Sequence, residues 1–212
     1  MEWVARKRGA FIALALTFFI SISIATAEFL GESSLVYKEE VLPLTCFETT
    51  TATLRVIEDS LCPGDLISLG NGPLQQILNE GSVTTSIHPL LQARFDAASV
   101  AAQSDGVHLY IASGFRSKAR QAELFAREVR IRGSETEAAK WVLPADYSHH
   151  PLGLAIDVNY PGDRPGAAWL EANGSRFGLC RVYANEWWHF EGAIAPGGVC
   201  PPMAANALVD LP

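Results

Sequence analysis

Four residues in the C-terminal half have types and spacing that could support hydrolysis: His150, Asp157, Glu186 and His189. Asp157 stands inside the apolar run GLAIDV, where a buried carboxylate is costly unless it is paired or binds a metal. Two imidazoles and one carboxylate form a common ligand set for catalytic zinc, whose fourth position is kept for water. A further carboxylate such as Glu186 would then serve as the base that takes the proton of that water.

These residues can share a site only if the chain bends. His150 and Asp157 would be about 23 Å apart on one extended strand, so the HPLG segment with Pro151 and Gly153 must fold back. Glu186 and His189 are three positions apart, which requires a bulge or a bend beside Glu186. Taken singly, these residues also fit a turn histidine, a capping aspartate and an exposed glutamate. Taken together, they favour a metal site.

Arg116 is a candidate for binding a substrate carboxylate or a developing oxyanion, because it follows a glycine turn just before a helix. In isolation, a surface arginine in a loop is the better interpretation of this residue. His149 should point away from His150 and is expected to face solvent or to support the site. The sequence contains neither an H-E-x-x-H helix motif nor a G-x-S-x-G elbow, so zincin and serine hydrolase sites are excluded.

The N-terminus predicts export. Arg6, Lys7 and Arg8 precede an apolar stretch over 9–24, and an A-x-A arrangement ends at Ala27. We therefore expect a signal peptide over 1–27, with an uncleaved membrane anchor as the alternative. An exported chain with four cysteines favours disulfides. Loop proximity favours two pairs, Cys46–Cys62 and Cys180–Cys200.

The charge balance limits the partners. The chain has 212 residues and a formal net charge of −7, which argues against nucleic acid and against an anionic membrane surface. The part after the leader has the size of a single domain. We expect a monomer.

The order of elements indicates an α+β fold with a small central antiparallel sheet and packed helices. Helical patterns cover 88–106, 117–133 and 167–178, and Ser117 and Gly133 are expected to cap the second of these. Strands are expected over 107–115, 153–160 and 186–192. We divide the chain into the leader, an extension of short strands and loops over 28–85, a main domain over 86–202 that carries the candidate site residues, and a tail over 203–212.

At this point the chain resembles a known family. Ser148-x-His150-x-x-Gly153-x-Ala155-x-Asp157, followed by Glu186-x-x-His189, resembles the signature of the zinc D-alanyl-D-alanine carboxypeptidases of the VanY type. SGFRS at 113–117 is similar to the SGYRS block of that family. The resemblance covers roughly 86–200. It departs from the family at Trp187, where relatives often have proline, and at Pro151, where they have a polar residue.

The resemblance implies the fold shared with the Hedgehog signalling domain. It implies one Zn²⁺ held by His150, Asp157 and His189, and Glu186 as the catalytic base. It further implies that Arg116 contacts the scissile carbonyl or the substrate carboxylate, and that Ser148 and Gln121 line the substrate.

The resulting expectation is a zinc D,D-carboxypeptidase of the cell envelope that hydrolyses the terminal peptide bond of peptidoglycan stem peptides. Two alternatives stay open. One is a peptidoglycan endopeptidase, cutting an L-Ala-D-Glu bond or a cross-bridge with the same site. The other is a zinc module without enzymatic activity that binds the wall or a partner. The residues alone predict a divalent metal ion but do not distinguish zinc from other divalent metals.

Overall fold

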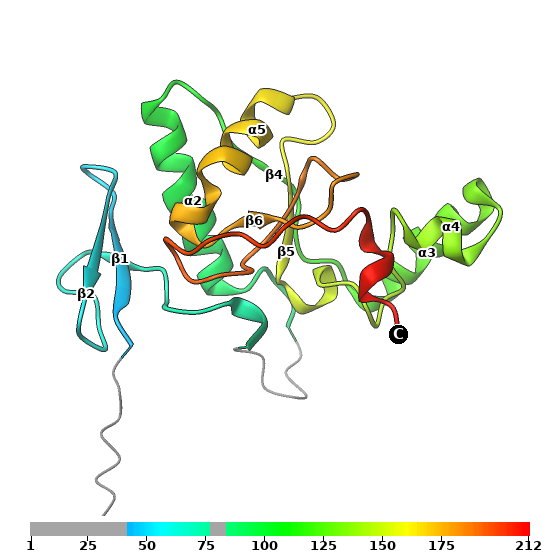
Figure 1. Cartoon of the computed structure of the whole chain (residues 1–212), viewed down its shortest axis with the longest axis horizontal. Coiled ribbons are helices and arrows are strands. Elements are labelled where there is room, and N and C mark those ends of the chain that lie inside the picture. The colour runs from blue at the N-terminus through cyan, green and yellow to red at the C-terminus, as the bar shows by residue number, and fades with distance from the viewer. Residues whose placement is uncertain (1–41, 77–83) are drawn as a thin grey trace, which may run out of the picture. The chain divides into compact units, whose positions relative to one another are not determined.

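The computed structural model describes residues 42–76 and 84–212 (Figure 1). Residues Val41–Pro212 form one compact unit. The predicted leader over 1–27 and the first part of the extension lie outside the described residues. Within the described ranges, no helix is both long and apolar enough to cross a bilayer.

The described residues contain four α-helices, and the capping residues explain where these helices begin and end. Helix α2 spans Pro89–Ser104 and begins where the His88 side chain accepts a hydrogen bond from the Leu90 amide. Helix α3 spans Lys118–Arg132, between an N-cap at Ser117 and a left-handed Gly133, as the sequence predicts. Helix α4 (Glu135–Ala139) was not predicted. Helix α5 (Arg164–Asn173) continues into the 3-10 helix η3 (Gly174–Phe177).

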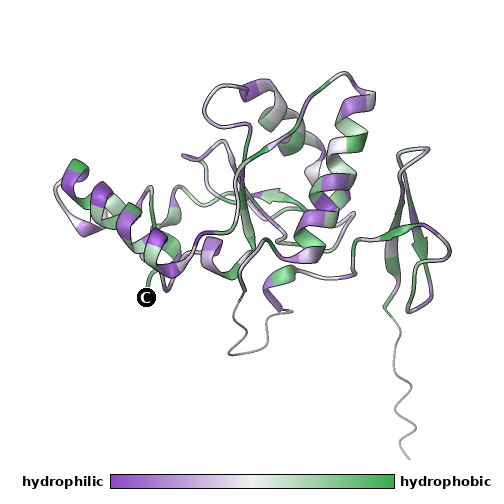
Figure 2. Ribbon diagram, turned by 180° about the vertical axis from the view of Figure 1, so that it is seen from behind, coloured by the Kyte–Doolittle hydropathy of each residue, from purple (hydrophilic) through white to green (hydrophobic). Residues whose placement is uncertain are grey.

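The central sheet is antiparallel, with the strand order β4-β5-β7-β6. Its strands are short: β4 Ile111–Ser113, β5 Ala155–Val158, β6 Cys180–Arg181 and β7 His189–Glu191. Helices α2 and α5 pack together on one side of β5, and α3 and α4 lie on the other side (Figures 1 and 2). The α+β expectation is confirmed.

The last predicted strand begins later than expected. The strand predicted over 186–192 is reduced to β7, because the chain turns before it. The Glu186 amide donates to the Tyr183 carbonyl, and the His189 amide donates to the Glu186 carbonyl, each at 3.3 Å. This turn is the bend that the three-residue spacing of Glu186 and His189 requires.

Before α2, a second sheet has the order β2-β1-β3, with β1 at Leu44–Glu48, β2 at Thr53–Ile57 and β3 at Ile67–Ser68. A disulfide joins Cys46 to Cys62. The 3-10 helix η1 (Leu74–Gln76) follows. Phe47, Leu69 and Leu74 are fully buried in the same core cluster as the residues of α2 and β5.

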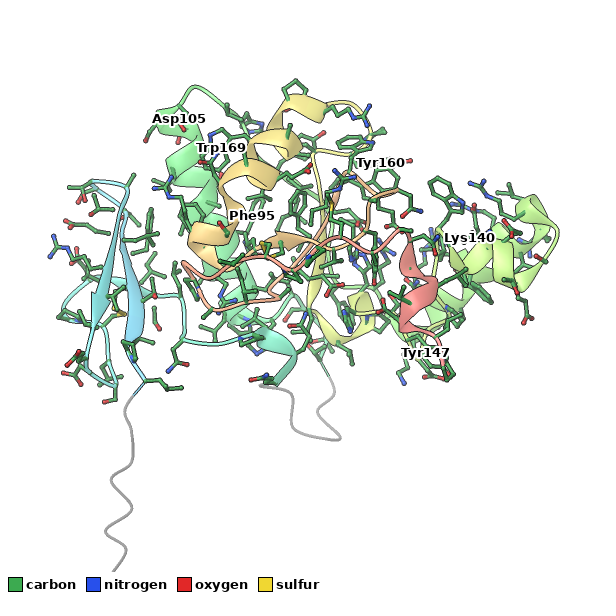
Figure 3. The ribbon with its side chains drawn as sticks, in the orientation of Figure 1. Phe95, Asp105, Lys140, Tyr147, Tyr160 and Trp169 are labelled. Carbon is green, nitrogen blue, oxygen red and sulfur yellow. A yellow bond between two sulfur atoms is a disulfide. The ribbon has the colours of Figure 1, made fainter. Side chains whose placement is uncertain are left out.

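The core also contains a buried arginine on α2, whose hydrogen bonds join several chain segments. Arg94 has no exposed surface, and its guanidinium donates to the carbonyls of Leu69, Gly72, Gly178 and Ile194. Burial lowers the pKa of Arg94 to about 10. The side chain therefore ties segments distant in sequence to one helix. A further link between α2 and α5 is the 2.9 Å hydrogen bond from Trp169 to Asp105, both labelled in Figure 3.

The C-terminal segment over 203–212 packs against helices α3 and α4. A disulfide joins Cys180 to Cys200, so both disulfides are the pairs that loop proximity favours. Tyr183 forms a parallel bridge with Ala204, and the 3-10 helix η4 (Ala207–Asp210) follows. A second apolar cluster contains Ala139, Leu143, Tyr183 and Ala207. The predicted tail over 203–212 thus packs against α4 and the chain before β7.

Candidate active site

Strand pairing and one turn bring the three predicted ligands together. Asp157 on β5 lies opposite His189 on β7. The 3-10 helix η2 (His150–Leu152) ends at a left-handed Gly153 and reverses the chain before β5. His150 Nε2 lies 3.4 Å from Asp157 Oδ1, and His189 Nδ1 lies 3.2 Å from the same oxygen. One ligand atom from each residue lies within 4.8 Å of the others, and all three residues are buried.

Hydrogen bonds orient both imidazoles so that one nitrogen of each faces the common point. Nδ1 of His150 lies 2.7 Å from the Gly114 carbonyl, so it carries the proton and leaves the Nε2 lone pair facing Asp157. Nε2 of His189 lies 3.0 Å from Glu191 Oε1, so Nε2 carries a proton and Nδ1 faces Asp157, where it can bind a metal once its own proton is lost. Orientation of ligand histidines by carbonyl and carboxylate partners is typical of metal sites.

The electrostatics of this group call for a cation. Although burial disfavours the charged imidazole, hydrogen bonds to Asp157 and Glu191 raise the pKa of His189 to about 10. Burial opposes ionisation of Asp157 as well, yet the neighbouring histidines hold the pKa of this carboxyl far below its usual range. Both shifts show that the group stabilises positive charge at the point where its members meet, and a metal ion bound there would supply that charge in place of the proton on His189 Nδ1. The donor set therefore fits a divalent metal ion.

Glu186 is buried beside the ligands, with Oε2 3.9 Å from His189 Nδ1. Burial raises the pKa of Glu186 to about 7, although the charge of His189 opposes this rise. The turn before β7 thus places a carboxylate next to the point where the three ligand atoms converge, without making it part of the strand.

Arg116 lies against the ligands rather than on the open surface. Its guanidinium donates to Ser113 Oγ at 3.0 Å and to Gln121 Oε1 at 3.1 Å. It also contacts His150 Nε2 at 2.9 Å and forms an ion pair with Asp157. The structure therefore brings the predicted arginine to the metal ligands.

The other two residues expected to line the substrate are both buried in the cleft wall. Gln121 accepts from Arg116 and donates to the Leu143 carbonyl at 2.8 Å, which fixes its amide. Ser148 Oγ accepts from the His150 amide at 3.4 Å, at the start of the turn that carries His150. Both residues line the cleft beside the ligands.

Glu191 is a site residue that the sequence reasoning missed. Besides His189, this buried carboxylate contacts His149 Nδ1 at 2.8 Å and Gln75 Nε2 at 3.0 Å. His149 therefore supports the site, which is one of the two alternatives expected from the sequence; the other was exposure to solvent. The available signal was strand alternation, because residues i and i+2 face the same side. That rule places Glu191 beside His189.

Tyr183 was also missed. Its ring stacks on the His189 imidazole with 5.2 Å between centroids. Its hydroxyl hydrogen-bonds to Asp210 in η4. The C-terminal segment thus restrains a ring that covers one metal ligand.

The ligands lie in a cleft with a volume of about 410 Å³. Tyr160, labelled in Figure 3, and Trp188 lie on its border, with 4.6 Å between ring centroids. Helix α3 contributes Arg120, Leu124 and Arg127 to another part of the lining. The cleft therefore combines a polar centre, an aromatic border and a basic wall.

A sheet that presents a buried His-Asp-His group, with a glutamate beside it in a cleft, defines a candidate metal-dependent hydrolase site. The family model VanY, described as D-alanyl-D-alanine carboxypeptidase, matches residues 84–192. The chain therefore belongs to the VanY family of D-alanyl-D-alanine carboxypeptidases. The match contains all three predicted metal ligands and Glu186.

Individual relatives are similar over part of the chain. A D-alanyl-D-alanine carboxypeptidase of Enterococcus faecalis is 34% identical over 139 residues, which are 55% of this chain and 50% of that protein. This chain thus spans about half of the enterococcal relative. The peptidoglycan L-alanyl-D-glutamate endopeptidase CwlK of Bacillus subtilis is 28% identical over 131 residues, covering 55% of this chain and 76% of that protein. A solved structure of VanYB in complex with D-alanine-D-alanine aligns with a TM-score of 0.48 at 27% identity, covering 54% of this chain and 80% of VanYB.

Proposed function

We propose that this protein is a zinc-dependent D,D-carboxypeptidase that hydrolyses the terminal D-alanyl-D-alanine bond of peptidoglycan stem peptides. The observation that carries the proposal is the convergence of His150, Asp157 and His189 on one buried point with Glu186 beside it. Membership of the VanY family supports the same reaction. We place the reaction outside the cytoplasmic membrane, in agreement with the predicted leader and with the cell-wall activities of the relatives.

Each residue of the site has a place in this reaction. His150, Asp157 and His189 would hold the ion, and Zn²⁺ bound there supplies Lewis acidity and lowers the pKa of water. Glu186 lies where it can take a proton from the attacking water and return it to the leaving amine. The Arg116 guanidinium, next to the ligands, would stabilise negative charge that develops on the scissile carbonyl oxygen. Ser148 and Gln121 would hold the turn and the arginine in position.

An endopeptidase acting on the same wall is the second candidate, and the similarity to the B. subtilis endopeptidase favours it. The two reactions differ in what must be recognised beyond the scissile bond. A carboxypeptidase binds a free terminal carboxylate, whereas an endopeptidase tolerates its amide. A zinc module without activity is less favoured, because a binding module has no need of a buried Glu186 beside the ligands.

The test is D-alanine release and zinc content of the purified chain. Peptides ending in D-Ala-D-Ala, with a free or an amidated C-terminus, are compared as substrates. We expect about one zinc per chain, release from the free peptide only, and a fall of at least about 100-fold in kcat for Glu186→Gln with zinc retained. Glu58→Gln, an exposed position on the β1–β2 side of the molecule, is the matched control and should keep full activity.

The contrary outcomes are distinct. Hydrolysis of the amidated peptide would establish the endopeptidase reading. Zinc binding without hydrolysis of stem peptide or intact wall would favour the interpretation as a zinc-binding module without enzymatic activity. Unchanged kcat in Glu186→Gln would remove Glu186 from the reaction.

A further inference from the structure

The basic wall of the cleft has no role in the reaction proposed above. Arg120, Leu124 and Arg127 line the cleft that holds the metal ligands. Their spacing of four and then three residues places them on one face of α3, because residues at i, i+4 and i+7 align along a helix. The wall therefore presents two guanidinium groups along one side of the cleft.

Both guanidinium groups are accessible and can bind an anionic ligand. Arg127 has no ion-pair or hydrogen-bond partner among residues 42–76 and 84–212. Arg120 pairs with Glu123 at 2.9 Å, but the two side chains are 59% and 68% exposed. Such a surface pair contributes little and exchanges readily. Arg116 differs, because it is bound to Ser113, Gln121 and the metal ligands. Arg120 and Arg127 can thus pair with a carboxylate remote from the scissile bond without giving up contacts to the metal ligands.

The length of the wall matches a short peptide. Seven residues of α-helix separate the two arginines by about 10 Å along the axis, and about three residues of extended peptide span that distance. A substrate whose reacting carbonyl lies beside Arg116, at the N-terminal end of α3, can run along the helix. Residues two or three positions before the scissile bond would then lie beside the two arginines.

The positive charge of the basic wall is opposite in sign to the net charge of the chain. The formal net charge is −7, so the average field repels an anionic peptide and a local pair of cations must offset this repulsion. Guanidinium groups bind carboxylates through directed hydrogen bonds as well as charge. A basic pair in the cleft of an acidic protein therefore points to a carboxylate on the substrate.

We propose that Arg120 and Arg127 form a binding subsite for a substrate carboxylate carried two or three residues before the scissile bond. This specificity rests on the proposed function, because it assigns a preference to the same cleft. In a stem peptide the group that fits is the α-carboxyl of a γ-linked D-glutamate. The subsite makes the protein select peptides in which this carboxyl is free over peptides in which it is amidated.

The test uses two synthetic pentapeptides, L-Ala-γ-D-Glu-L-Lys-D-Ala-D-Ala and the same peptide with the D-glutamate α-carboxyl amidated. Their affinities for the full zinc-loaded chain carrying Glu186→Gln are measured by calorimetry, so that binding is read without turnover. We expect the free acid to bind about 3- to 10-fold more tightly than the amide. The ratio should fall toward one when Arg120→Gln and Arg127→Gln are added, singly or together.

Arg130→Gln is the matched control, because Arg130 is an exposed arginine of the same helix and does not line the cleft. It removes the same charge and should leave the ratio unchanged. The ratio in the parent chain should also fall as salt increases. Circular dichroism and thermal melting confirm that each variant is folded.

Three results would overturn the subsite: equal affinity for the two peptides in the parent chain, an equal loss of preference in Arg130→Gln, or no measurable binding of either peptide. Failure of the subsite is separable from failure of the proposed function. D-Alanine release from both peptides at equal rates would remove the subsite and keep the carboxypeptidase. Preferential binding of the acid without any hydrolysis by the wild type would keep the subsite and remove the carboxypeptidase.

Discussion

Glu191 shows how a residue outside the ligand set can determine the chemistry of a ligand. It is buried, and its two oxygens contact the imidazoles of His189 and His149. Interactions with these histidines hold the pKa of Glu191 far below its usual range, although burial acts in the opposite direction. The carboxylate therefore remains ionised and keeps the proton of His189 on Nε2, which leaves Nδ1 to bind the metal.

Replacing Glu191 by Gln should weaken zinc binding. The change keeps the shape of the side chain but removes the charge that fixes the tautomer of His189. Loss of such a supporting carboxylate typically lowers metal affinity by about 10- to 100-fold. Titration against a chelator of known affinity measures this loss, and Glu58→Gln provides the baseline. Equal zinc affinity in the two folded variants would show that Glu191 is not needed to orient His189.

At the residue scale, the sequence was sufficient to identify a site residue where that residue type is unusual in its local sequence. A carboxylate within GLAIDV is costly unless it serves a site, so Asp157 could be selected, and Glu186 could be selected once it was considered together with His189 and the other candidate ligands. Glu191 and Asp210 could not be selected in this way, because acidic residues near a strand end or a C-terminus are ordinary. Their roles depend on contacts with His149 and Tyr183 that only the folded chain brings about.

At the scale of elements, the turn η2 decides whether His150 reaches the site. Gly153 ends this turn with φ +71°, and a Cβ atom there would lie 2.5 Å from the Ser86 carbonyl oxygen. The Gly153 carbonyl also accepts from the His88 amide at 2.9 Å. The position thus requires both a left-handed backbone and the absence of a side chain.

Gly153→Ala should therefore cost more stability than Gly106→Ala. Gly106 has a nearly equal φ of +74° but no atom within 4 Å of an added Cβ. Left-handed strain alone costs about 1–2 kcal/mol, and we expect roughly 3 kcal/mol or more at Gly153, where the backbone must also shift. Urea unfolding measures both values. Zinc affinity should fall only in Gly153→Ala, and equal effects of the two substitutions would contradict this account.

The elements themselves were predicted unevenly, for physical reasons. Helix α3 matched at both ends because Ser117 and Gly133 are strong capping residues. The strands were predicted too long, because apolar runs continue into turns that are buried by tertiary packing. The turn before β7 is one such case: Trp187 and Trp188 resemble strand residues, yet the backbone bends there and carries Glu186 into the site.

At the scale of the whole molecule, residues 42–76 of the predicted extension contribute to the core that supports the site. Phe47 packs edge-on against Phe177 with 6.2 Å between ring centroids. Arg94 donates two of its hydrogen bonds to the carbonyls of Leu69 and Gly72. The boundary near residue 85 rested on the change there from a pattern of short strands and loops to a helical one, and the family resemblance did not extend before it. Sequence similarity could not reveal that residues before the boundary share the core.

A chain reduced to residues 86–212 should therefore lose cooperative folding, whereas one reduced to 42–212 should keep it. The shorter chain lacks Phe47, Leu69 and Leu74, each fully buried and each contributing roughly 2 kcal/mol or more. It also leaves the buried charge of Arg94 with fewer acceptors. These losses together are comparable with the whole stability of a typical domain, about 5–15 kcal/mol.

Thermal unfolding of both chains, each with zinc present, measures the difference. The 42–212 chain is the control for truncation itself, because it retains every described residue. A cooperative transition for 86–212 within a few degrees of that control would show that the peptidase domain folds without the extension. A broad, non-cooperative transition together with lost zinc binding would show that the metal site depends on a core that reaches back to β1.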